Sequence, residues 1–281
     1  MKKILFLIAA FALLGAVVSC SDDDEPRHSD GVFTVNTPMV NHIVDLNTGN
    51  VLGMSSTHNK LTIDTVNHKA SLELRYNDGS DKTLKLTDLT ARPSRRGFYV
   101  LSSPSYANFK GYVDFNESSM RYTYTTTDGI RVISTISEVF FLKTQNIITY
   151  DDTTEATSME NVMYQFNLEP GQQTCIVKVM DIVHAKDLKR FINITASSVP
   201  VTVTTNGYII AGNDLKTNAI YMAHMDSTGT STGTKSTDKY PFKTFNATVD
   251  LENDSLETTF MMGSSATVVA SGRTYPDYTA Y

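Results

Sequence analysis

Apolar and polar residues alternate over short stretches along most of the chain. Representative stretches are Leu72-Glu73-Leu74-Arg75-Tyr76, Met120-Arg121-Tyr122-Thr123-Tyr124 and Ala247-Thr248-Val249-Asp250-Leu251. A period of two predicts β-strands with one buried and one solvated face. Turn pairs of a type that accepts positive φ in tight hairpins also occur, namely Asp78-Gly79, Asp128-Gly129 and Asn206-Gly207. No stretch keeps a helical period for three turns, so the sequence predicts an all-β protein.

Four blocks in the first half of the chain match four blocks in the second half, in the same order. Phe109–Phe115 and its continuation to Tyr124 match Phe245–Leu251 and its continuation to Phe260, Gly97–Val100 matches Gly207–Ile210, His42–Val44 matches Asn146–Ile148, and Leu61–Asp64 matches Phe166–Glu169. This internal duplication predicts two tandem antiparallel repeats, each a β-sandwich or an open barrel, over residues 32–138 and 139–281. The alternative is that two β meanders align through their alternation alone.

Much of the extra length of the second repeat lies at about residues 212–242. This range contains the low-complexity run Ser227–Thr234, which predicts a flexible loop. Such a loop is either a binding loop or, more commonly, a tolerated surface insertion.

The N-terminus has the pattern of an export signal. Lys2 and Lys3 precede an apolar run from Ile4 to Val18, which is followed by Ser19-Cys20. A helix of that run spans only about 22 Å, less than the ~30 Å of a bilayer core. We therefore expect residues 1–19 to be a signal peptide rather than a membrane span.

Val17-Val18-Ser19-Cys20 resembles the lipobox of bacterial lipoproteins, which implies cleavage before Cys20 and acylation of its thiol, with palmitate as a typical chain. The acidic run Ser21–Glu25 resembles the tether of surface-exposed lipoproteins of Bacteroides-type bacteria. The resemblance implies that residues 20–31 are a lipidated tether, that the membrane is a partner through this lipid, and that the protein is anchored in the outer membrane at the cell surface. The alternative is an ordinary secretory signal with an incidental cysteine.

A weaker resemblance concerns the second repeat. Asn206-Gly207-Tyr208-Ile209, the long loop, Tyr240-Pro241-Phe242 and the spacing of Phe245, Ala247, Val249 and Asp250 resemble domains of unknown function in outer-membrane lipoproteins of Bacteroides-type bacteria. The resemblance covers about a third of the chain and implies calycin-like or β-sandwich repeats. It implies no activity and carries over no functional residue.

Composition and motifs give no support for an enzyme. The formal net charge of −6 argues against nucleic acid as a partner. If Cys20 carries lipid, Cys175 has no intrachain partner, and its apolar strand setting predicts a buried thiol rather than a nucleophile. The six histidines are widely spaced, and no nucleotide-binding or hydrolase motif is present. We therefore expect no catalytic residue, no metal site and no cofactor, and a hydrolase is the least favoured function.

The favoured function is a cell-surface binding module for a glycan, lipid or protein. Sugar rings often stack on aromatic side chains, and the chain has no Trp but fourteen tyrosines. The candidate ligand-binding residues are Tyr99, Tyr106, Tyr112, Tyr122 and Tyr124. The alternative for these tyrosines is cross-strand packing, and the alternative for the protein is a structural or adhesive envelope component.

Overall fold

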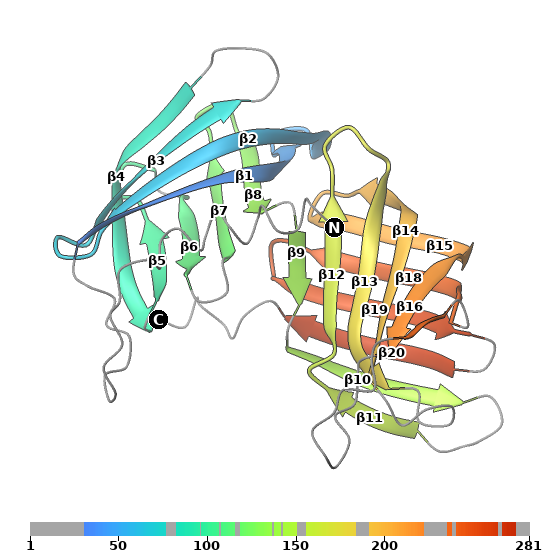
Figure 1. The fold of residues 1–281 in the computed structure, drawn as a ribbon. Coiled ribbons are helices and arrows are strands. Elements are labelled where there is room, and N and C mark those ends of the chain that lie inside the picture. The colour runs from blue at the N-terminus through green and yellow to red at the C-terminus, as the bar shows by residue number, and fades with distance from the viewer. Residues whose placement is uncertain are drawn as a thin grey trace, which may run out of the picture.

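The computed structural model describes residues 31–76, 83–95, 97–106, 108–115, 119–136, 138–141, 143–150, 156–183, 191–221, 235–237, 240–263 and 266–273. These residues form twenty strands in two antiparallel units, which confirms the all-β fold class (Figure 1). Within the described ranges, no helix has the length and apolar character needed to cross a membrane. The predicted signal peptide, Cys20 and residues 20–30 of the predicted tether lie outside the described residues.

The first unit is a closed eight-stranded barrel. Its strands are β1 (Val32–Asp45), β2 (Asn50–Asp64), β3 (Lys69–Tyr76), β4 (Thr83–Arg95), β5 (Phe98–Ser102), β6 (Lys110–Asp114), β7 (Ser119–Thr125) and β8 (Ile130–Ile136). Each strand pairs with its neighbour in sequence, and β1 also pairs with β8 through residues 39–45. The expected open barrel is thus a closed one, because β1 is long enough to pair along both of its edges.

The second unit is a curled sheet in the order β11-β10-β20-β19-β18-β15-β14-β13-β12-β9, with β16 and β17 attached at β14 (Figure 1). Its strands are β9 (Glu138–Phe141), β10 (Lys143–Tyr150), β11 (Ala156–Glu160), β12 (Met163–Leu168), β13 (Thr174–Val183), β14 (Phe191–Val203), β15 (Gly207–Leu215), β16 (Thr217–Tyr221), β17 (Lys235–Thr237), β18 (Phe242–Asp250), β19 (Ser255–Met262) and β20 (Ala266–Arg273). The end of β15, together with β16 and β17, lies in the range at about 212–242 that was predicted to be a loop. The sequence did not predict these strands, because the range is rich in Thr and Asn and shows little alternation of apolar and polar residues.

Two strands of the second unit are interrupted versions of barrel strands. Residue 142 alone separates β9 from β10, and Asn161 and Val162 alone separate β11 from β12. β9 pairs with β12 and β10 with β11, so the interrupted strands form one long hairpin, as β1 and β2 do. Asn161 has a φ of 61°, which marks the bend in one of them. When each interrupted strand is counted once and β16 and β17 are left out, the second unit repeats the order of β1 to β8, and β20 pairs with β10 as β8 pairs with β1.

The β6–β7 and β18–β19 hairpins have the same register. The pairs Lys110↔Thr123, Tyr112↔Arg121 and Asp114↔Ser119 of the barrel correspond to Asn246↔Thr259, Thr248↔Glu257 and Asp250↔Ser255. This agrees with the sequence match between residues 109–124 and 245–260. The side chains differ, however. A Cβ on Gly111 would lie 2.7 Å from the Cβ of its partner Tyr122, whereas the corresponding Ala247 pairs with the smaller Thr258.

Two other sequence matches are displaced by one residue. The amide of Phe115 donates to the carbonyl of Gly97, and the amide of Leu251 donates to that of Asn206, each at 2.8 Å. Gly97 therefore corresponds to Asn206 and not to Gly207. Similarly, Ile133 pairs with His42 as the corresponding Val269 pairs with Ile147, so His42 corresponds to Ile147 and not to Asn146.

Candidate functional site

The five predicted ligand-binding tyrosines do not form an exposed aromatic patch. Tyr99, Tyr122 and Tyr124 lie in the barrel core, Tyr112 is buried with its ring stacked on Phe98 at 5.4 Å, and Tyr106 is half-buried. The Tyr122 ring stacks on Phe109 at 5.9 Å and on Tyr124 at 6.2 Å. Burial raises the pKa of Tyr122 and of Tyr124 above the usual value. The alternating Tyr122 and Tyr124 therefore pack inside the barrel.

The other groups considered for chemistry are also dispersed or buried. Cys175 is buried, and burial raises the pKa of its thiol to about 12, which suppresses the thiolate. Among the described residues, no three His, Cys, Asp or Glu side chains come close enough to hold a metal ion.

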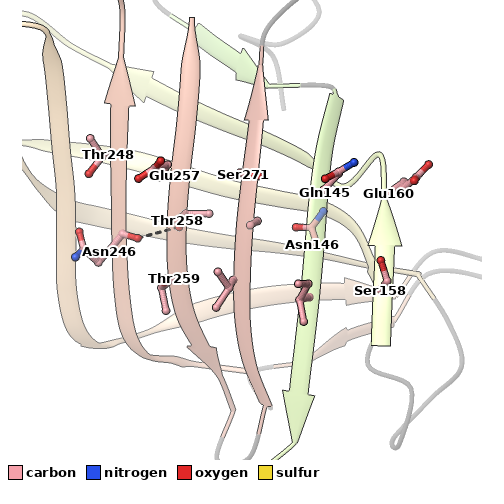
Figure 2. A pocket seen from close by; sticks show the side chains of 13 residues that line it. Gln145, Asn146, Ser158, Glu160, Asn246, Thr248, Glu257, Thr258, Thr259 and Ser271 are labelled. Carbon is pink, nitrogen blue, oxygen red and sulfur yellow. Dashed lines mark hydrogen bonds between the residues drawn. The ribbon is translucent and has the colours of Figure 1, made fainter. Parts of the chain in front are cut away.

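A hollow lies on the outer face of the second unit, over β18, β19, β20, β10 and β11. We call this surface the trough (Figure 2), and its volume is about 560 Å³. Its lining residues are Gln145, Asn146, Ile147, Ser158, Glu160, Asn246, Thr248, Glu257, Thr258, Thr259, Val269, Ala270 and Ser271. A further hollow continues from Gln145 and Glu160 toward Arg273.

The outward-facing side chains of the trough form two rows that cross five strands. One row is Thr248, Glu257, Ser271, Gln145 and Glu160, and the other is Asn246, Thr259, Val269, Ile147 and Ser158. Neighbours within a row are paired residues on adjacent strands, so they repeat at about 4.8 Å. The exposed fractions of Ile147 and Val269 are 52% and 49%. The trough is therefore a mostly polar surface with an exposed apolar pair in one of its two rows.

The floor of the trough is held by hydrogen bonds from below. Asn146 is fully buried, donates to the Thr144 hydroxyl at 2.9 Å and accepts from the Tyr164 hydroxyl at 2.6 Å. Thr258 donates to the carbonyl of Asn246 at 3.0 Å. These bonds fix the strands, so the outward side chains stand on a rigid base.

The lining of the trough does not place its two glutamates side by side. Glu160 and Glu257 stand at positions three strand spacings apart, or about 14 Å across the sheet. Glycosidase carboxylates lie roughly 5–9.5 Å apart. The amides, hydroxyls and carboxylates can instead make separate hydrogen bonds to one extended partner. No sequence pattern predicted this surface, because its residues are ordinary polar positions of strands whose neighbours the sequence does not show.

A second, smaller cavity of about 240 Å³ lies between the two units. Its cationic residues are Lys110, Arg121 and Arg131 of the barrel, and Leu251 and Glu252 of the second unit close it. Such a cluster would suit an anion, but two of the three cations already have partners. Arg121 forms an ion pair with Asp254, and Arg131 lies 3.1 Å from the Glu252 carboxylate and donates to the Thr205 carbonyl at 2.9 Å. The cavity is thus part of the contact between the units.

His42 completes this contact. Its Nε2 donates to the carbonyl of Thr204 at 2.6 Å, and its ring meets Tyr208 edge-on at 5.6 Å. The side chain is fully buried, and Nδ1 has no partner among the described residues. Burial lowers the pKa of His42 below 6.5, and although the Thr204 carbonyl opposes this, the charge of Arg131 lowers the pKa further. The ring is therefore neutral at pH 7.

The two inter-unit ion pairs should contribute unequally to stability. Asp254→Asn leaves the Arg121 charge buried without its partner, so we expect the free energy of unfolding to fall by about 3–5 kcal/mol. Asn also tolerates the φ of 53° at this position. Glu252→Gln is the matched control: the Glu252 side chain is 53% exposed, so its loss should cost at most about 1 kcal/mol. Denaturant unfolding at neutral pH measures both, and equal small effects would show that the Arg121 pair is not buried in solution.

His42 should make the folded protein weaker in mild acid. Its folded pKa is below the ordinary value, so the unfolded chain takes up the proton more readily, and stability is lost as the pH falls below about 6.5. The loss is at most about 1.4 kcal/mol per pH unit. His42→Gln keeps a donor for the Thr204 carbonyl and should reduce this slope between about pH 7.5 and pH 5. An unchanged slope in His42→Gln would contradict the assignment.

Comparisons with known proteins give this chain no relative: no protein-family model, no curated protein and no solved structure matches it. The geometry of the trough and of the inter-unit contact is therefore the basis for a functional argument.

Proposed function

We propose that this chain is a lipid-anchored, non-enzymatic binding protein of the bacterial outer membrane and that the trough binds a protein partner. The anchor is supported by the N-terminal sequence, in which Cys20 follows a short apolar signal. The binding role is supported by one observation above all: the exposed apolar pair Ile147 and Val269 lies beside the polar side chains of an open face. Exposed apolar side chains flanked by polar ones are common in protein interfaces.

The same surface argues against the other ligand classes. Among the described residues, no aromatic side chain lines the trough, so they offer a sugar ring no stacking platform there. A lipid needs a continuous apolar cavity, whereas the side chains of the trough are mostly amides, hydroxyls and carboxylates. Both barrel-like interiors have tightly packed aromatic cores, with Tyr122, Tyr164, Phe245 and Phe260 almost completely buried. A protein surface fits the available contacts best.

Photo-crosslinking in the source bacterium tests this function. A photoreactive amino acid at Ser271, on the exposed surface of the trough, should give protease-sensitive adducts with protein. The same amino acid at Thr87, an exposed position on β4 of the barrel, is the control and should give none. Adducts that resist protease but are cleaved by periodate would point to a glycan instead, and the absence of adducts from Ser271 would contradict the proposal.

A further inference from the structure

The cavity between the two units carries more positive than negative charge. Its cations are Lys110, Arg121 and Arg131 of the barrel. The acids that contact these cations are Glu252, which pairs with Arg131, and Asp254, which pairs with Arg121. Among these five side chains, one positive charge is therefore left without a counter-charge.

The strand register places the three cations around one residue, Thr123. Lys110 on β6 is paired with Thr123 on β7. Arg121 lies two positions before Thr123 on the same strand, and Arg131 on β8 is paired two positions after it. Residues two apart on a strand, and diagonal neighbours on adjacent strands, lie about 7–8 Å apart. All four side chains line the cavity, so long cationic side chains approach its interior from three adjacent strands.

The ion pairs leave donors of two of these cations unused. Arg131 directs Nη1 to the Glu252 carboxylate and Nη2 to the Thr205 carbonyl, but its Nε is buried and has no hydrogen-bond partner among the described residues. Lys110 is exposed, and its ammonium group has no partner among the described residues either. A buried N–H without an acceptor is costly. An acceptor that binds in the cavity removes this cost and supplies the missing negative charge.

Other buried polar atoms at the same contact also lack partners. Among the described residues, nothing hydrogen-bonds to the hydroxyl of Tyr208, whose ring meets His42 edge-on, or to the hydroxyl of Thr135, which is paired with Arg121. Burial raises the pKa of Tyr208, although the charge of Arg121 opposes this, so the hydroxyl keeps its proton. Buried polar groups are normally satisfied by protein, water or an ion. The protein alone does not satisfy the polar groups of this contact.

We propose that this cavity binds a phosphate group between Lys110, Arg121 and Arg131. Its volume of about 240 Å³ is enough for one such group and a few water molecules, at ~30 Å³ each. Asn108, Lys110 and Glu252 are exposed, so the cavity can be reached from solvent. The site shares no residue with the trough and lies outside the proposed function.

The directions of the donors favour a tetrahedral anion over a planar one. Arg131 has only Nε to offer, so it cannot bind a carboxylate through two parallel hydrogen bonds. Lys110 acts as a point charge whose three N–H groups rotate to meet an acceptor. Donors on three strands suit the diverging oxygens of a phosphate group, and the pairing of Glu252 with Arg131 limits the repulsion from its carboxylate. The inorganic ion and the phosphate of a small ester offer the same chemistry.

Calorimetric titration of the purified full chain in detergent with inorganic phosphate, at constant ionic strength, tests the site. One phosphate should bind per chain. Lys110→Met removes the cation that takes no part in the inter-unit ion pairs and should weaken phosphate binding at least about tenfold, because the surplus charge is lost. Lys60→Met, at an exposed strand position outside the cavity, is the matched control and should bind phosphate as wild type does.

The side-chain Nε–H resonance of Arg131 reports on the site directly. In nitrogen-15 NMR spectra, this resonance should shift as phosphate saturates the wild-type chain, because the unused donor gains an acceptor. At the same phosphate concentration it should shift less in Lys110→Met. Glycerol phosphate separates the two sources: tighter binding than that of inorganic phosphate identifies an ester as the ligand, and weaker binding identifies the free ion.

Three results would each overturn the site. They are an absence of saturable phosphate binding, equal affinity in Lys110→Met and wild type, and an Arg131 Nε–H resonance that stays in place at saturation. Crosslinking from Ser271 in the trough does not depend on phosphate, so the phosphate site and the proposed function can fail separately.

Discussion

Burial of His42 and Arg121 of the barrel against the turns of the second unit is the contact on which the arrangement of the whole chain depends. Arg121 and Asp254 are each only 9% exposed in their side chains, and a buried charge requires its partner. His42 is neutral in the same contact and donates its single N–H to the Thr204 carbonyl. These contacts fix the position of one unit relative to the other, because moving the units apart would leave buried polar groups without hydrogen-bond or ion-pair partners.

The two units use one frame for two purposes. Arg121 and Glu257 stand at the same position of corresponding hairpins, and the sign of the charge decides which turns can pack there. Likewise, Ile133 and Val269 are both apolar, but the first is buried and the second is exposed. The trough is therefore the exposed counterpart of a surface that is buried in the barrel.

The sequence predicted the β class and the correspondence between the β6–β7 and β18–β19 hairpins, because alternation is strong there and the two segments align without a gap. The sequence matched His42 with Asn146, whereas the fold matches it with Ile147. The match was wrong by one residue because His42 points outward from the barrel but is buried, and outward positions are usually solvated. It could not tell that Tyr122 and Tyr124 point inward, since alternation gives two faces without naming the core. The sequence did not predict the trough, because strands far apart in the chain, such as β10 and β20, become neighbours only in the fold.

The central claim is that corresponding positions are covered in the first unit and open in the second, and thiol accessibility measures this directly. Val269→Cys and Ile133→Cys place a thiol at the corresponding positions, and the native Cys175 is buried and serves as an internal standard. With a soluble thiol reagent under native conditions, the thiol in Val269→Cys should react at the rate of an exposed cysteine. The thiol in Ile133→Cys should react at least about a hundredfold more slowly, because the units must first separate. Equal fast rates at the two positions would contradict the account.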